Sequence, residues 1–156
     1  MAERLSTGHV NSQLATTRTD YANGVLAIFG GASQPTSAND AETGTLLCLI
    51  TRNSGAFTGG VSTNGLNFDA PVDGVLSKAA AETWSGVGLA AAGTGTTATY
   101  YRFYANAYTT GSSTTAKRFD GAISTSASSE LQMSVTSIVE GVTVTVNTFT
   151  FTQPKA

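Results

Sequence analysis

The stretches Leu131–Val135 (LQMSV) and Val142–Phe151 (VTVTVNTFTF) alternate apolar and polar residues at nearly every position. This period of two is typical of a strand with one covered face. The apolar phase slips by one residue at Asn147-Thr148 and resumes at Phe149. A slip of this kind inside a regular strand indicates a β-bulge. The C-terminal part therefore predicts a hairpin with one buried face.

Upstream of this hairpin, short apolar runs alternate with turn residues. Val25–Phe29 is closed by two glycines, and Thr45–Thr51 is apolar on both faces, so both runs indicate covered strands. Asn64-Gly65 is a dipeptide that closes two-residue hairpins. About eight strands at spacings of roughly ten residues predict an all-β fold. We expect a single-domain antiparallel β-sandwich, jelly-roll-like in its connections.

The N-terminal residues 1–22 lack this strand pattern and predict an extended or short-helical arm ahead of a sandwich domain at 23–156. Asn11 or Ser12 would cap a short helix, and Asn23-Gly24 would stop it. No apolar stretch is long enough for a signal sequence or a membrane span. We therefore expect synthesis in the cytoplasm and no membrane partner.

The composition favours a protein that binds the surfaces of other proteins. Charged residues are only 12% of the chain and apolar residues 40%, with a net charge of −2. Disorder needs the opposite combination, so the chain should fold. A surface rich in Thr and Ser costs little to desolvate, and the cores of protein interfaces are poor in charge for the same reason. The alternative is that low charge is simply usual in a Thr-rich β protein. Eight basic residues and a pI near 5.2 argue against a nucleic-acid partner.

Residues for catalysis or metal binding are scarce. The single histidine, His9, lies in the predicted arm, and the single cysteine, Cys48, lies in an apolar run. Nucleophilic catalysis needs a nucleophile beside a base, and a transition-metal site needs several His or Cys ligands, so one residue of each type is not enough. The acidic loop Asn39–Glu42 is interpreted as a turn in preference to a calcium site. Asp120, like the other acids near turns, is interpreted as a solvated charge. We expect no enzyme activity and no cofactor.

The aromatic strand Thr99–Tyr104 is the strongest candidate for a contact surface. Two interpretations stay open: a tyrosine face for protein or sugar, or a core strand whose second face lies at an edge. Together with the arm, it gives nine candidate interface residues: Leu5, His9, Leu14, Arg18, Tyr21, Tyr100, Arg102, Tyr104 and Tyr108.

Several segments resemble a family of small tailed-phage and prophage proteins. They are Asn23–Phe29, Gln34–Ala38, Glu42–Leu47, Thr63–Phe68, Lys78–Gly86, Tyr101–Ala107 and Arg118–Gly121. The resemblance covers most of the chain, residues 20–153, and implies a virion structural protein. It carries no functional residues with it.

Within a virion, the resemblance implies most directly a capsid decoration (cement) protein on the capsid surface. Such proteins are often trimeric and clamp subunits of the major capsid protein. The alternatives are a tail or baseplate-associated protein and a carbohydrate-binding module on the particle surface.

Overall fold

The computed structural model describes residues 4–153, which form a mostly β protein with 39% of its residues in strands and one α-helix. The all-β prediction is confirmed. In chain order the elements are α1 (Thr7–Asp20), β1 (Val25–Gly30), β2 (Thr45–Arg52), β3 (Val75–Ser77), β4 (Trp84–Val87), the 3-10 turn η1 (Ala90–Ala92), β5 (Thr96–Tyr104), β6 (Arg118–Ser124), β7 (Leu131–Met133), β8 (Ser137–Ile138) and β9 (Thr143–Thr152).

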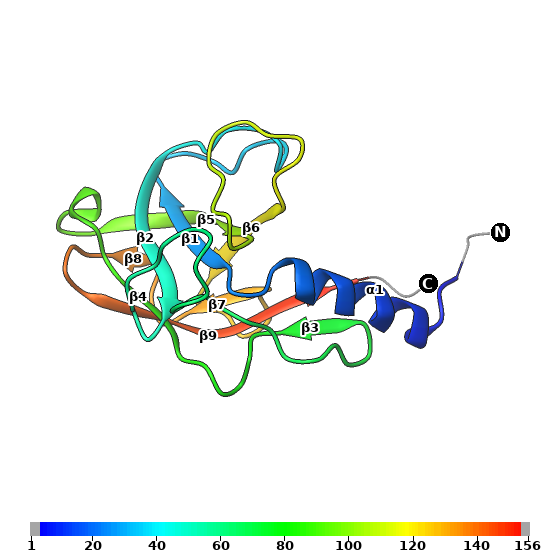
Figure 1. Ribbon diagram of the computed structural model, residues 1–156. Coiled ribbons are helices and arrows are strands. Elements are labelled where there is room, and N and C mark those ends of the chain that lie inside the picture. The colour runs from blue at the N-terminus through cyan, green and yellow to red at the C-terminus, as the bar shows by residue number, and fades with distance from the viewer. Residues whose placement is uncertain (1–3, 154–156) are drawn as a thin grey trace.

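The sheet closes on itself, because β1 pairs with β2 on one side and with β5 on the other. The order β1-β2-β4-β9-β7-β6-β5 makes a seven-stranded barrel (Figure 1), with β3 attached to β9 and β8 to β5. The predicted jelly-roll sandwich is not supported, since it would need two separate sheets. One pair, β6 with β7, is parallel, which also corrects the expectation of a purely antiparallel fold.

Strand β1 explains why the barrel is covered outside as well as inside. All six of its residues are buried. Leu26 and Ile28 point into the interior core, whereas Val25, Ala27 and Phe29 join a second apolar cluster on the outer face. The prediction that this run is covered on both faces is therefore confirmed. The second cluster needs a cover of its own, which two long loops provide.

The interior core is built around aromatic rings from distant parts of the chain. The ring centroids of Trp84, Phe103 and Phe149 lie 5.7–6.2 Å apart. Phe68 packs against all three of these rings. Burial of this much aromatic surface is the main driving force for closing the barrel.

The β-bulge predicted in β9 is confirmed. Gln132 pairs with Thr148 and Met133 pairs with Val146, so Asn147 is the extra residue. Beyond the bulge, Thr148 and Phe149 still pair with β7, and the last residues of β9, 150–152, pair with β3. The bulge lets Val146 and Phe149 both face the core although they are three residues apart.

Helix α1 begins earlier than the sequence predicts. Its cap is Ser6, whose hydroxyl accepts a hydrogen bond from the His9 amide at 3.2 Å, and not Asn11 or Ser12. The helix lies beside β3 and the end of β9 and projects from the barrel (Figure 1). Val10 and Leu14 are fully buried and belong to the interior core cluster. The segment expected to be an arm therefore contributes to the core.

Candidate functional site

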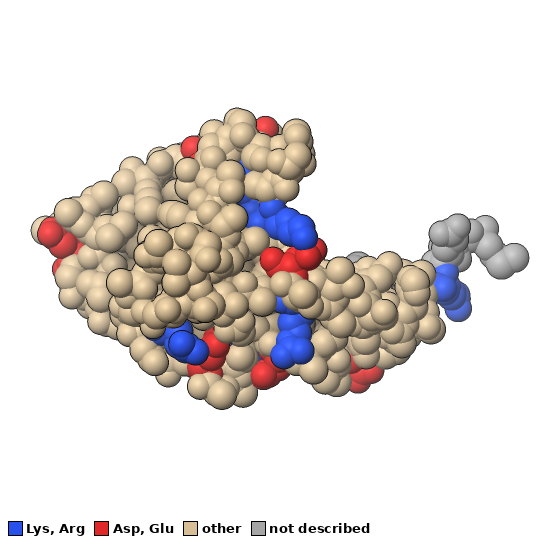
Figure 2. Space-filling view, viewed as in Figure 1, with Lys and Arg blue, Asp and Glu red and all other residues tan. Residues whose placement is uncertain are grey.

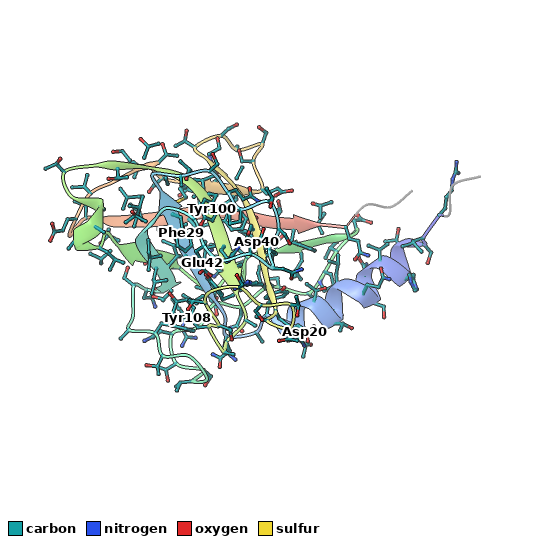
Figure 3. All side chains as sticks on the ribbon, turned by 90° about the horizontal axis from the view of Figure 1, so that it is seen from above. Asp20, Phe29, Asp40, Glu42, Tyr100 and Tyr108 are labelled. Carbon is teal, nitrogen blue, oxygen red and sulfur yellow. The ribbon has the colours of Figure 1, made fainter. Side chains whose placement is uncertain are left out.

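The second face of the aromatic strand β5 lies beneath loops. Tyr100 and Tyr104 are at most 1% exposed, and Arg102 is fully buried. The cover comes from the loops at residues 31–44 and 105–117, which lie side by side in Figure 1. Figure 3 shows Phe29 of β1, Tyr100 of β5 and Glu42 of the first loop close to one another. Of the two interpretations left open for this strand, the contact surface is contradicted by this burial, and the second face is a core of its own instead of an edge.

Tyr100 ties the first of these loops to the barrel. Its hydroxyl donates to the carbonyl of Thr43 at 2.7 Å and accepts from the Thr43 amide at 3.0 Å. Its ring stacks on Phe29 with centroids 4.9 Å apart. All the polar and apolar surface of this tyrosine is used inside the chain.

Arg102 is the centre of a buried ionic cluster. Its Nε and Nη2 atoms donate to the two carboxylate oxygens of Asp120, at 2.5 and 2.7 Å. Its Nη1 atom donates to Glu42 Oε1 at 3.0 Å and to the Asp40 carbonyl at 2.9 Å. This is the bidentate geometry that makes an arginine–carboxylate pair strong, and it satisfies a charge that burial would otherwise disfavour.

Arg118, on the neighbouring strand β6, binds the loops through their backbone. Its Nε atom donates to Ala38 at 2.6 Å, its Nη1 atom to Gly111 at 2.5 Å and its Nη2 atom to Asn39 at 3.0 Å, each at the carbonyl. The loops also bond each other, since the Ser113 amide donates to the Asn39 carbonyl at 2.9 Å. One side chain thus fastens both loops to the barrel.

The cluster changes the protonation of its members. Burial tends to raise the pKa of Glu42, but hydrogen bonds from Tyr104, the Gly111 amide and Arg102 outweigh burial and hold this pKa below its usual value. Burial, together with the bond to Glu42, raises the pKa of Tyr104. The Asp120 and Glu42 carboxylates raise the pKa of Arg102 against the opposing effect of burial. At neutral pH the glutamate is therefore charged and the tyrosine is neutral.

Glu42 and Asp120 are the residues of this site that the sequence did not reveal. Asp120 was interpreted as a solvated charge, whereas its side chain is 3% exposed and lies in β6, directly opposite Arg102. The usable signal was Arg102 itself. It shares one face of the strand with Tyr100 and Tyr104, and an arginine on a covered face requires an acidic partner. The cluster is enclosed and serves to hold the loops in place.

The remaining candidate interface residues are divided between surface and interior. His9 and Arg18 are exposed on α1, and Leu5 just before it is 39% exposed. Tyr21 is half-buried with its ring edge against Phe119. Leu14 is buried, which excludes it as a contact in the folded chain.

Tyr108, the last of these candidates, is half-buried in the second loop. Its ring packs on Tyr104 and Phe57, and its backbone has a φ of +50°, unusual for a bulky residue. It lines a cavity of about 270 Å³ together with Ala107, Ser113 and Lys117. Lys117 is paired with Asp20 at 2.5 Å.

The single cysteine is buried in the core, and the single histidine is exposed on helix α1. Burial raises the pKa of the Cys48 thiol to about 12, so it is not a thiolate at neutral pH. His9 lies on the exposed side of α1. No three His, Cys, Asp or Glu side chains of the described residues come together as a metal site would need. The acidic loop uses its carboxylates internally, since Asp40 accepts from the Ser37 amide and Thr36 hydroxyl.

The surface is poor in charge and carries exposed apolar side chains. Figure 2 shows a mostly uncharged surface, on which the few acidic and basic side chains lie in small scattered groups. Val87, Leu89 and Val142 are 40–50% exposed near the end of β4 and the start of β9, where the Gly88 amide donates to the Val142 carbonyl. Within the described part of the chain, α1 is too short and too polar to cross a bilayer.

Comparison of the chain with protein-family models, with curated proteins and with solved structures finds no match.

Proposed function

We propose that this protein is a bacteriophage virion structural protein, most specifically a capsid decoration protein that binds and stabilises the lattice of the major capsid protein. The sequence resemblance supports a virion, and the charge-poor surface supports a contact role. The single observation that carries the proposal is the projecting helix α1. Its outward residues Ser12, Ala15, Thr16 and Thr19 are small and uncharged.

Such a face suits docking against another protein. Small side chains allow close approach of a partner backbone, and no ion has to be desolvated when the face is covered. Each subunit would bury an ordinary interface, and many copies on one shell would reinforce it together.

A tail or baseplate role shares these features and differs in copy number. The carbohydrate-binding alternative loses its motive, because the tyrosine face that suggested it is buried.

The test is the copy number in purified virions, measured by quantitative mass spectrometry. A decoration protein should be present in numbers comparable to the major capsid protein. A few copies per particle would assign the chain to the tail instead, and absence from the particle would overturn the virion role.

A second experiment asks whether α1 makes the contact. Deleting residues 1–22 is unsuitable, because it removes Val10 and Leu14 from the core. We expect Thr16→Asp to weaken binding to particles that lack the protein while leaving its melting temperature nearly unchanged. The matched control is Leu14→Ala, which should cost about 2–5 kcal/mol of stability. If Thr16→Asp binds as tightly as the unmodified protein, this face is not the contact.

A further inference from the structure

The geometry points to a carboxylate-binding site at Arg18, and we propose that it receives an acidic side chain of the protein to which this chain docks. Arg18 is exposed on the last turn of α1. It lines a cavity of about 250 Å³ with Thr19, Ala22, Asn67 and Phe68. The assignment of a protein partner rests on the proposed function, whereas the carboxylate site itself does not.

Arg18 is held in place by one end of its guanidinium group. The Nε atom donates to the Phe68 carbonyl at 2.8 Å, on a segment fifty residues away. Within residues 4–153 its Nη1 and Nη2 atoms make no hydrogen bond or ion pair. A side chain that is already fixed loses less conformational entropy on binding, so these free groups are preorganised for a ligand.

The other basic groups around cavities in the described residues are already engaged. Lys117 pairs with Asp20 at 2.5 Å, and Lys78 Nζ donates to the Glu82 carbonyl at 2.7 Å. Arg102 and Arg118 are buried in the ionic cluster. Arg18 therefore combines an unpaired positive charge, a fixed orientation and an accessible cavity.

The acids near this cavity form no ion pair with Arg18 among the described residues and have other hydrogen-bond partners. The Glu82 carboxylate accepts from the Asn67 amide, the Asn67 side chain and Trp84 Nε1, all at 2.9 Å. Asp69 accepts from the Ala80 amide at 2.9 Å, and Asp20 is bound to Lys117. The planar nitrogens Nη1 and Nη2 match the two oxygens of a carboxylate, which gives the ligand class.

The first experiment measures binding of the full-length protein and its variants to particles stripped of it. We expect R18Q and R18K each to lose at least about tenfold in affinity, because lysine keeps the charge but not the planar pair of donors. The matched control is R52Q, which removes an exposed arginine with no ion pair in the described residues. It should stay within about twofold. Denaturation midpoints of all variants identify any loss that comes from unfolding.

The second experiment probes the site without any particle. Acetate and inorganic phosphate are titrated at constant ionic strength into labelled protein, and the Thr19 and Asn67 amide NMR signals are followed. We expect a saturable shift with acetate that is absent in R18Q. No saturable shift, or tighter binding of phosphate than of acetate, would overturn the carboxylate assignment.

The two experiments fail in different ways. If R18K binds particles like the unmodified protein, or R52Q loses as much as R18Q, the arginine-specific contact is wrong. If the unmodified protein binds no particle while acetate still saturates the site, the decoration role fails and the carboxylate site stands.

Discussion

Arg102 illustrates at the residue scale how this charge-poor chain uses its few charges. Its guanidinium group is fully buried, and Asp120, Glu42 and the Asp40 carbonyl satisfy it. Burying an ion pair costs desolvation energy that the pair barely recovers, so its presence is weak evidence for extra stability. Breaking the pair is different, because it leaves a buried charge without a partner.

The first prediction concerns the cost of removing one partner of this buried ion pair. Asp120→Asn should destabilise the protein by about 3–5 kcal/mol, since the buried Arg102 then lacks its bidentate partner. Urea denaturation monitored by Trp84 fluorescence measures the loss. Glu140→Gln, an exposed acid on the same protein, is the control and should stay within about 0.5 kcal/mol. Equal midpoints for the two variants would show that the cluster does not hold the loops.

The second prediction concerns pH. Because the pKa of Glu42 is lower in the folded chain than in the unfolded one, the stability it contributes is present above the unfolded pKa, about 4.3, and is lost as pH falls through the folded pKa. Glu42→Gln lacks this contribution. The difference in unfolding free energy between the unmodified protein and the variant should therefore shrink on acidification, as urea titrations at several pH values would measure. A difference that stays constant with pH would contradict the role of the charge.

At the scale of elements, the barrel depends on the close approach of β4 and the residue that follows it, Gly88, to neighbouring segments. A Cβ atom at Gly88 would lie 2.0 Å from the Val139 carbonyl oxygen, and one at Gly86 would lie 2.2 Å from the Leu49 carbonyl oxygen. Both contacts are with backbone, which cannot move aside as a flexible side chain does. Glycine is required at these positions because the backbone segments pass each other closely there.

The third prediction follows from this packing. Gly88→Ala should destabilise the protein by at least about 1–3 kcal/mol, as overpacking does. Gly8→Ala is the contrasting control, because nothing lies within 4 Å of its Cβ position in the exposed first turn of α1. It should be neutral or stabilising by up to about 1 kcal/mol. Thermal denaturation of both variants tests the difference in sign, and a neutral Gly88→Ala would mean that the segment around Gly88 can move away from Val139.

At the scale of the whole molecule, the surface has few charges to keep copies apart. Val87, Leu89 and Val142 are exposed near the end of β4 and the start of β9, and the helix α1 projects from the barrel (Figure 1). The fourth prediction is a homo-oligomer, with a trimer favoured by the resemblance to virion proteins. Native mass spectrometry should then find three times the chain mass of 15.9 kDa. A monomer at micromolar concentration would contradict it.

The sequence predicted much of the fold but little of its closure. The period-two pattern identified the strand β9, and the phase slip located its bulge at Asn147, because both are local consequences of the pleat. Closure depends on β1 pairing with β5, about seventy residues away, and no local pattern encodes such a partner. The sandwich and the barrel therefore looked alike from the sequence.

The sequence likewise predicted only part of the candidate site. The alternating faces of β5 were correct: Tyr101 and Phe103 lie in the interior core, and Tyr100 and Tyr104 lie in the outer cluster. Whether that outer face met solvent depended on loops that carry no periodic signal. Arg18 was named from sequence as a contact candidate, but its fixed geometry depends on the distant Phe68 carbonyl.

By itself, then, the sequence determined an all-β chain with one histidine and one cysteine, because composition and side-chain period are local properties. The tertiary structure decided which tyrosines are hidden, which acids pair with Arg102 and which arginine keeps free donors. Those outcomes depend on segments that lie 18 to 60 residues apart in the chain and meet only in the folded structure. Burial and pairing are set by such long-range contacts, so residue order alone could not specify them.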